Sequence, residues 1–348
     1  MLGSTLSAGA LRAAHSKKNL TDLLEPISVE LPRVEESLAN QVRSFDERLG
    51  SQIQYILGGT GKRLRPSLAL LAGGATGRVA EEHITLAVIV ELIHIATLVH
   101  DDVLDEAELR HRLPTSNSRW GNEISVLLGD CLFAHALRLA ASYATTDVCR
   151  KVSEATNTVC SGEIIQNQRR FDLNLTLDQY LDIINMKTGT LFAVSCELGA
   201  MLNAASSIVV KSMRDFGINL GIAYQVYDDC LDIFGQERQA GKSLGTDMKK
   251  GKLTLPFLLL LQHMGSDRRE ELGAMIFHNS QEEQQRLLKL ALGNGVIEES
   301  LATIDAYVAR ARNNLAGLPA NAYTKTLGTL TGYLSDQSRL LLKEIAVP

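Results

Sequence analysis

Proline and aromatic residues are scarce in this chain, which has 7 prolines, 8 phenylalanines, 8 tyrosines and 1 tryptophan among 348 residues. Because proline interrupts helices, its scarcity permits many long helical segments. Leu, Ala, Glu and Arg are abundant and favour helix. Strict alternation of apolar and polar residues is rare, whereas apolar residues recur with helical spacing nearly everywhere after residue 27. The sequence therefore predicts an all-α protein.

Cysteine pairs with metal-binding or redox spacing are also lacking. The five cysteines are scattered and no Cys-x-x-Cys pair occurs, so neither a zinc site nor a redox motif is indicated. Scattered cysteines without a secretory signal are typical of a reducing compartment, and we expect a cytoplasmic protein. Residues 1–19 carry basic side chains and no acidic one. We predict a flexible tail over residues 1–20, with an organelle presequence at 1–19 as the alternative.

An excess of positive charge is missing, since the formal net charge is −5. This balance excludes a general attraction to nucleic acid or anionic membranes, so an anionic substrate needs a local cluster of cations. No apolar run is long and pure enough for a convincing membrane span. The longest, Ile84–Val99, is interrupted by Glu91 and His94. It predicts a buried core helix.

No proline-rich or serine-rich linker divides the chain, and we predict one catalytic domain over residues 21–348. Val29–Leu57 is expected to form one amphipathic helix. Pro66 suits the first turn of the next helix, which three glycines between positions 73 and 77 are expected to interrupt. Further helices are expected at roughly 81–108, 119–144, 146–170, 177–203, 206–234, 253–264, 267–277, 281–294, 296–315 and 321–345.

Two acidic motifs match each other. Asp101-Asp102-Val103-Leu104-Asp105 resembles Asp228-Asp229-Cys230-Leu231-Asp232, 127 residues later, and each ends an apolar helical run. Residues i and i+4 share one face of a helix, about 6 Å apart, so the first and last aspartates of each motif point the same way. These carboxylates repel one another, and the helix dipole disfavours anions at a C-terminal end. The motifs therefore indicate a compensating cation.

Magnesium satisfies this requirement because it prefers oxygen ligands, takes few carboxylates and completes its shell with water and substrate phosphates. The motifs lack the glycine turn of a calcium loop, so an EF-hand is not supported. A solvated acidic helix end is the alternative for either motif alone. Two matching motifs together with a basic loop favour a magnesium site.

The basic loop is Gly58–Arg65, which has three cations in its last four positions. Its glycines allow close backbone approach, and an arginine fork suits phosphate oxygens. It is not a Walker A motif, because no Ser or Thr follows the lysine. A solvated basic turn is the alternative. His94 and Lys187 lie between apolar residues of predicted helices, where such a histidine is more often a core residue and a lysine must reach a polar surface.

Taken together, these motifs resemble those of the trans-isoprenyl diphosphate synthases. A Gly-Lys-Arg-x-Arg-Pro loop and two Asp-Asp-x-x-Asp motifs occur in the family's order at Gly61–Pro66, Asp101–Asp105 and Asp228–Asp232. The resemblance extends over about residues 30–345. It implies a single-domain helical bundle of isoprenoid synthase type around a deep central cavity, with the two aspartate motifs facing each other across its mouth.

The resemblance also implies an activity. The family consists of Mg²⁺-dependent prenyltransferases that condense isopentenyl diphosphate with an allylic diphosphate. We accordingly expect Mg²⁺ as cofactor, these two diphosphates as substrates, a membrane-seeking product, a homodimer and no nucleic-acid partner.

Particular residues match the family's functional positions. Those that bind isopentenyl diphosphate correspond to Lys62, Arg65 and His94. The Mg²⁺ ligands correspond to Asp101, Asp105 and Asp228, with Asp102, Asp229 and Asp232 supporting them directly or through water. The allylic and leaving diphosphates are contacted at the positions of Arg110, Lys187 and Lys242. Polar groups near the developing allylic cation correspond to Thr188 and Gln225.

One departure from the family pattern follows the first aspartate motif. The family has Arg-Arg-Gly where this chain has Arg110-His111-Arg112. The second arginine of the family contacts isopentenyl diphosphate. Either His111 supplies a weaker, pH-sensitive contact here, or Arg112 takes its place.

Product length is expected to depend on the residues one helical turn before Asp101, below the first motif. This chain has Ala96 and Thr97 there, with Ile93 next on roughly the same face. Short-chain members resemble this stretch but often have Phe or Tyr, which block the growing tail. We therefore expect a C30–C50 product. The alternatives are a geranylgeranyl or farnesyl diphosphate synthase, and an Ala96 that merely packs between helices.

Two further classes share part of this pattern. A class I terpene cyclase has the first aspartate motif, but it normally has an Asn/Ser/Glu metal motif in second position and lacks the Gly-Lys-Arg loop. A non-catalytic regulatory subunit of a hetero-oligomeric synthase usually loses one aspartate motif. This chain retains both motifs and the loop, which favours the enzyme.

Overall fold

The computed structural model describes residues 20–59, 61–110, 113–235, 245–278 and 280–345. Most of the predicted tail lies outside these ranges, as do His111, Arg112 and Lys242; Leu20, predicted in the tail, begins α1. The described residues are almost entirely helical, and their one sheet has two short strands. The all-α prediction is confirmed.

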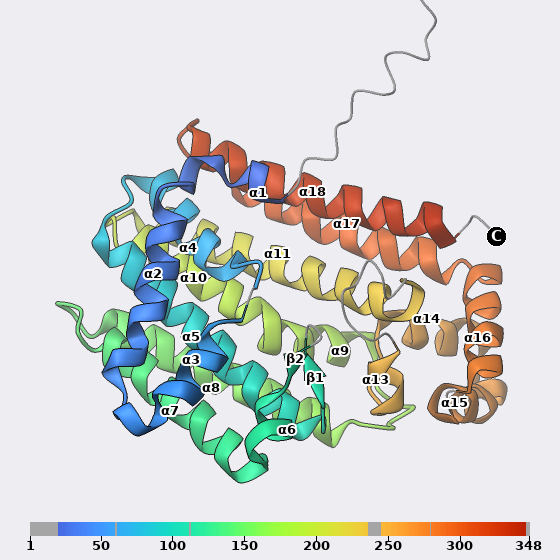
Figure 1. Cartoon of the computed structure of the whole chain (residues 1–348). Helices are drawn as coiled ribbons and strands as arrows, with labels where there is room; N and C mark the ends of the chain where they lie inside the picture. Colours follow the sequence, from blue (N-terminus) through green and yellow to red (C-terminus); the bar gives the residue numbers. More distant parts are fainter. Residues whose placement is uncertain (1–19, 60, 111–112, 236–244, 279, 346–348) are drawn as a thin grey trace, which may run out of the picture.

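The first half of the chain contains α5 and most of the helices that pack against it, while α1 lies against α18 (Figure 1). Their bounds are α1 (Leu20–Leu23), α2 (Glu30–Asn40), α3 (Gly50–Leu57), α4 (Leu64–Thr76), α5 (Glu81–Leu104), α6 (Ser116–Trp120), α7 (Asn122–Ala140) and α8 (Asp147–Gln168), with short helical turns η1 (Glu25–Ile27), η2 (Gln41–Ser44) and η3 (Glu47–Leu49). A hairpin of β1 (Leu109–Arg110) and β2 (Leu113–Pro114) follows α5.

In the second half, α11 packs against α10, α14, α17 and α18, while α15 and α16 lie at one end of the molecule (Figure 1). Helices α17 and α18 run alongside each other on one side. The bounds are α9 (Leu177–Ile184), the π-turn η4 (Asn185–Gly189), α10 (Thr190–Met201), α11 (Ser207–Phe234), α13 (Thr246–Lys249), α14 (Leu255–Met264), η5 (Ser266–Arg268), α15 (Arg269–His278), α16 (Gln281–Gly293), α17 (Val296–Asn314) and α18 (Ala322–Ile345).

Helix α5 is a core helix. Among the described residues it is the one helix long and apolar enough to cross a membrane by length and composition, but 72% of that window is buried inside the protein. Ile89, Leu92 and Ala96 are completely buried. Because both sides of α5 pack against other helices, its apolar character is explained by the core.

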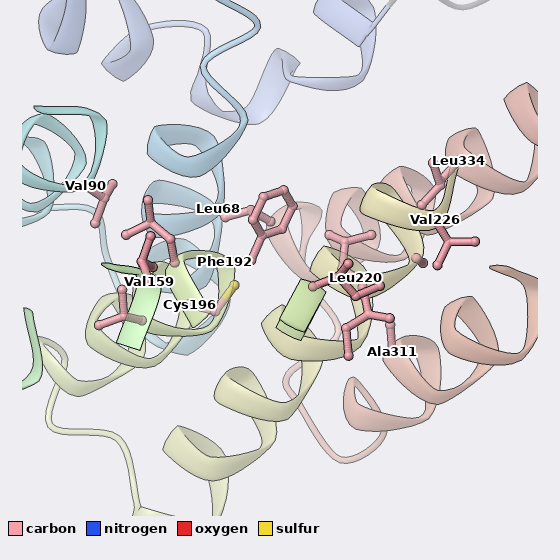
Figure 2. Packing of buried hydrophobic residues seen from close by; sticks show 14 of the residues in the cluster. Leu68, Val90, Val159, Phe192, Cys196, Leu220, Val226, Ala311 and Leu334 are labelled. Carbon is pink, nitrogen blue, oxygen red and sulfur yellow. The ribbon is translucent and has the colours of Figure 1, made fainter. Parts of the chain in front are cut away.

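The core is continuous from one end of the bundle to the other. Figure 2 shows buried side chains from several helices, among them Leu68 of α4, Phe192 of α10, Leu220 of α11 and Ala311 of α17. Phe192 is one of the largest side chains with no exposed area. The helix ends carry the polar residues described below, and this packing keeps those ends in fixed positions.

Two expectations about helix limits are wrong. The region predicted as one helix over Val29–Leu57 is divided into α2 and α3, because Phe45 is extended and Asp46 caps a new turn by accepting from the Arg48 N–H at 3.0 Å. Helix α4 continues through Gly73 and Gly74, two of the three glycines expected to interrupt it, and ends at Thr76, with the third, Gly77, as its C-cap residue. A side chain on Gly73 would meet the His83 ring at 2.4 Å, so this glycine permits close packing.

Candidate active site

One large cavity, of about 2190 Å³, is lined by α5, α8, α11, α18 and the loop before α4. Asp101 and Asp228 both line it, although they lie 127 residues apart in the chain. The helical bundle therefore brings the two acidic motifs to one cavity. The sequence-predicted residues on its wall are Lys62, Arg65, His94, Thr97, Asp101, Asp102, Asp105, Arg110, Lys187, Thr188, Gln225 and Asp228.

Asp102 is held by Arg110 of the β-hairpin. The Arg110 guanidinium donates to Asp102 Oδ1 from Nη2 at 2.7 Å and from Nε at 3.0 Å. Burial disfavours the charge on Arg110, but the hydrogen bond and charge of Asp102 outweigh it and raise the pKa of Arg110. This pair ties the hairpin to the end of α5.

Asp105 is bound by three cations from two other turns of the chain. Arg170, which follows α8, approaches its carboxylate at 2.9 Å, and Lys250 and Lys252 each approach at 3.1 Å. Burial alone would raise the pKa of Asp105, but the two lysines outweigh it and lower that pKa. Asp105 is therefore kept ionised on the cavity wall.

Asp101 has a different environment. No described residue donates a hydrogen bond to its side chain. Burial, and then repulsion from Glu163, raise the pKa of Asp101 to about 6 although Lys187 and Lys252 oppose the shift. A carboxylate that is costly to ionise gains strongly from a divalent cation.

The second motif is divided between the cavity and the core. Asp228 lines the cavity, whereas Asp229 and Asp232 are 4% and 2% exposed and lie behind the wall. Asp229 accepts hydrogen bonds from the Tyr180 hydroxyl at 2.5 Å and from Gln225 Nε2 at 2.8 Å. Burial, and then the charge of Asp247, raise the pKa of Asp229 to about 8. Asp229 therefore anchors Gln225 from within the protein.

Lys187 and Thr188 lie on the π-turn η4, which interrupts an otherwise continuous helix. Such a turn changes the direction of side chains and often occurs at functional sites. Lys187 pairs with Glu163 and donates to Gln166. Thr188 donates its hydroxyl hydrogen to Gln225 Oε1 at 2.7 Å. The turn therefore directs both residues toward the cavity.

The basic loop contributes Lys62 and Arg65 to the cavity, on the side where His94 of α5 also lies. The Arg65 guanidinium carbon lies 5.0 Å from the centre of the Phe192 ring, a cation–π contact. Burial, and then the charges of Arg65, Arg110 and Arg63, hold the pKa of His94 well below its usual value. Lys62 and Arg65 thus place two cations, beside a neutral His94, on the wall of the cavity that the aspartates also line.

A model of the polyprenyl synthetase family matches residues 46–291. The chain belongs to the polyprenyl synthetase family. Octaprenyl diphosphate synthase of Escherichia coli (strain K12) is 35% identical over 245 residues, which cover 70% of this chain and 76% of the relative. Heptaprenyl diphosphate synthase component 2 of Geobacillus stearothermophilus is 36% identical over 313 residues, which cover 89% of this chain and 97% of the relative.

Solved structures agree with this membership. A polyprenyl synthase from Caulobacter crescentus CB15, complexed with calcium and isoprenyl diphosphate, superposes with a TM-score of 0.86 at 31% identity, covering 92% of this chain and 98% of that chain. The predicted family and isoprenoid synthase fold are thus confirmed. As a polyprenyl synthetase, the chain is a prenyltransferase.

The donor set of this polyprenyl synthetase fits magnesium. Within the described ranges, no three His, Cys, Asp or Glu side chains converge on one point. Mg²⁺ does not need such a cage, because it binds one or two carboxylates and takes its other ligands from water and phosphate. Asp101, Asp105 and Asp228 supply oxygen donors on the wall of one cavity.

Sequence reasoning missed several polar residues of the polyprenyl synthetase site, of which Glu163 lines the cavity while Arg170 and Tyr180 contact its aspartates from outside the described lining. Glu163 and Arg170 come from α8 and the turn after it, and Tyr180 from α9. None stands in an acidic or basic motif, so the pattern along the chain carried no signal for them. Their contacts with Lys187, Asp105 and Asp229 appear only once the helices pack.

The three residues expected to limit product length are not equivalent. Thr97 lines the cavity and donates its hydroxyl hydrogen to the His94 carbonyl at 2.7 Å. Ile93 and Ala96 are 1% and 0% exposed and are not among the described residues of the cavity wall. They pack inside the helical bundle, so their role in product length stays a prediction.

Proposed function

We propose that this chain catalyses the Mg²⁺-dependent condensation of isopentenyl diphosphate with an allylic diphosphate. The observation that carries the proposal is the shared cavity, which is lined both by Asp101 and Asp228 and by the basic residues Lys62 and Arg65. Carboxylates for a divalent cation and cations for phosphate oxygens are thereby combined, as a reaction between two diphosphates requires.

In this proposal Mg²⁺ is held by Asp101, Asp105 and Asp228. When bound, it neutralises the charge that develops on the leaving diphosphate. Asp102, Asp229 and Asp232 keep these ligands in position. Arg170, Lys250 and Lys252 keep Asp105 in position through their ion pairs with its carboxylate.

The chain's own residues orient the two substrates. Lys62, Arg65 and His94 bind the diphosphate of isopentenyl diphosphate, with His111 or Arg112 supplying a further contact. Arg110 binds the allylic diphosphate, and Lys187 and Lys242 bind the leaving diphosphate. Holding two reactants in one geometry contributes roughly 7–11 kcal/mol to such reactions.

Thr188 and Gln225 face the carbon from which the allylic diphosphate departs. Because Gln225 donates to Asp229 and accepts from Thr188, its carbonyl oxygen is directed toward the cavity, where it stabilises developing positive charge. The double bond of isopentenyl diphosphate attacks that carbon. The departed diphosphate then removes the proton, so no protein base is needed.

The proposed product is a C30–C50 trans-polyprenyl diphosphate. This length is supported by the octaprenyl and heptaprenyl synthases among the relatives and by the small side chain of Thr97 on the cavity wall. The fold alone does not determine product length. A short-chain geranylgeranyl or farnesyl diphosphate synthase is the second candidate, and Ile93 and Ala96 remain candidates for a deeper limit.

The test is incubation of the purified chain with farnesyl diphosphate, isopentenyl diphosphate and Mg²⁺, followed by sizing of the products. We expect C30–C50 products and none with EDTA. A C15 or C20 end product would reject the long-chain proposal. Absence of turnover by the isolated chain, with activity only after a second subunit is added, would favour the regulatory-subunit alternative.

We also propose that the chain forms a homodimer in the cytoplasm. Helices α7 and α8 expose Ile124, Leu127, Ile164 and Ile165, between 37% and 59% exposed, and a second copy would cover them. The component 2 name of one relative gives a hetero-oligomer as the alternative. Size-exclusion chromatography with light scattering distinguishes a dimer from a monomer that awaits a partner, and cell fractionation tests the location.

A further inference from the structure

Arg63 differs from its neighbours in the basic loop. Its backbone is left-handed, with φ 49°, immediately before α4. A residue with a side chain is strained in this conformation and adopts it only where the surroundings hold it. Its guanidinium, 9% exposed, donates to Glu35 at 2.6 Å, to Glu91 at 2.7 Å and to the Gly59 carbonyl at 2.8 Å.

Arg63 lines the cavity, but these bonds engage its guanidinium with protein groups rather than with a diphosphate. Each of its three guanidinium nitrogens already donates to a protein acceptor: Nε to Glu35, Nη1 to Glu91 and Nη2 to the Gly59 carbonyl. The bond to Gly59 closes the loop that carries Lys62, since Gly59 and Arg63 flank that residue. Of the three cations in the loop, Lys62 and Arg65 therefore remain for substrate.

Glu91 lies between two arginines. Its side chain is 4% exposed and accepts from Arg63 through Oε1, whereas Oε2 is buried without a hydrogen-bond partner. The charge of Glu91 also acts on Arg65, whose Nε is likewise buried without a partner. A buried acceptor and a buried donor that lack partners tend to pair when the structure permits it. Glu91 is therefore a competitor for the guanidinium of Arg65.

We propose that Arg63 is a positioning residue for isopentenyl diphosphate: it neutralises Glu91 and closes the loop, which leaves Arg65 available to the substrate. This inference rests on the proposed function, because it concerns the cations assigned to isopentenyl diphosphate. Without Arg63, the uncompensated Glu91 carboxylate draws Arg65 out of the pocket.

The test compares Arg63→Gln, Glu91→Gln and the double variant. We expect Arg63→Gln to raise both KM and the calorimetric Kd for isopentenyl diphosphate about tenfold or more, as for loss of a charge-assisted contact. KM for farnesyl diphosphate should stay within about threefold. The double variant should recover isopentenyl diphosphate affinity to within about threefold of the wild type, since the competing charge is gone.

Controls separate this proposal from a general effect on folding. Arg33→Gln removes another ion pair, with Glu81 on the surface, and should leave every constant unchanged. Glu91→Gln alone keeps an acceptor for Arg63 and should leave isopentenyl diphosphate affinity within about threefold. Thermal unfolding of each variant reports whether the fold is intact.

The outcomes are distinguishable. A double variant no better than Arg63→Gln, or a tenfold loss in Glu91→Gln alone, overturns the proposal. If Arg63→Gln does not fold, Glu91→Gln still decides, because the proposal requires that removing the competitor does not weaken binding. Failure of the wild type to bind or consume isopentenyl diphosphate would instead reject the proposed function.

Discussion

Tyr180 and Asp229 are joined by a hydrogen bond beneath the cavity wall, with the tyrosine hydroxyl donating to Asp229 Oδ2 at 2.5 Å. Tyr180 is 2% exposed and Asp229 4%. The other carboxylate oxygen accepts from Gln225, which accepts in turn from Thr188. A buried side chain on α9 therefore orients two groups on the cavity wall through an aspartate that does not itself line the cavity.

Tyr180→Phe tests this chain of hydrogen bonds. The substitution leaves a buried carboxylate oxygen without its donor, so the free energy of unfolding should fall by about 1–3 kcal/mol. The orientation of Gln225 should loosen, and kcat should fall about tenfold. Urea unfolding and steady-state kinetics measure the two effects. Tyr143→Phe, which removes a bond to the Glu82 carbonyl, should lower stability alone; an equal loss of kcat there would contradict the interpretation.

Asp101→Asn should separate stability from activity. Since the folded pKa of Asp101, about 6, lies above its usual 3.8, the ionised side chain destabilises the metal-free fold at neutral pH. The neutral amide should therefore raise the free energy of unfolding in EDTA by on the order of 1–2 kcal/mol. Turnover with Mg²⁺ should nevertheless fall more than about 100-fold.

The matched control for Asp101→Asn is Asp130→Asn, at a side chain that is 60% exposed. It should change neither quantity. An Asp101→Asn protein that is less stable than the wild type in EDTA would show that burial and the repulsion from Glu163 do not dominate at this position.

His135 should contribute to acid sensitivity. Burial, and then the charge of Arg138, lower the pKa of His135 to about 4 from 6.5. Because the unfolded chain binds this proton first, the free energy of unfolding should fall as the pH drops from about 6.5 to about 4, by on the order of 1–3 kcal/mol. The contribution of His135 is the difference between the free energies of unfolding of the wild type and of His135→Gln, measured by urea unfolding at each pH. If the free energies of unfolding of the two proteins change in parallel with pH, His135 does not contribute to acid sensitivity.

Gly251→Ala should disturb the cations around Asp105. Gly251 lies between Lys250 and Lys252 with φ +70°, and an added Cβ would meet the Phe171 ring at 2.6 Å. Gly265 also has positive φ, +77°, but open space around it. Gly265→Ala should therefore lower the free energy of unfolding by about 1 kcal/mol, because of the backbone conformation alone. Gly251→Ala should lower it by about 1–3 kcal/mol more, because the added Cβ overpacks against Phe171.

Gly251→Ala should also weaken Mg²⁺ binding measured by calorimetry, whereas Gly265→Ala should not. Equal unfolding free energies for the two variants would show that Phe171 yields without cost and that the turn is not held by this contact.

Product length should respond to Thr97 more directly than to Ala96. Thr97→Phe places a ring on the cavity wall and should shorten the product under the conditions used for the wild type. Ala96→Phe must fit a ring into a site with 0% exposure, so it should lower the free energy of unfolding by about 1–3 kcal/mol. Product sizing and thermal unfolding check the pair. If Thr97→Phe makes products of unchanged length, Thr97 does not limit product length.

Much of the fold was predictable from local pattern. Apolar spacing predicted most helices because a helix buries one face whatever it packs against. Local pattern failed where packing decided the outcome. Gly73 was expected to interrupt α4, but the His83 ring requires a glycine there. Val29–Leu57 was expected to be continuous, but the cap at Asp46 begins a new turn.

The sequence by itself determined which side chains are able to bind a cation and a diphosphate, since the spacing of the aspartates and the basic loop is a property of the chain. Only the tertiary structure decided how they are divided between substrate and scaffold. Arg63 and Arg65 both line the cavity, but Arg63 is paired with Glu35 and Glu91 whereas Arg65 has no ion pair among the described residues. Likewise Asp229 lies in the core while Asp228 lines the cavity. The physical reason is that ion pairing and burial depend on residues up to 147 positions away in the chain, which meet only when the helices pack.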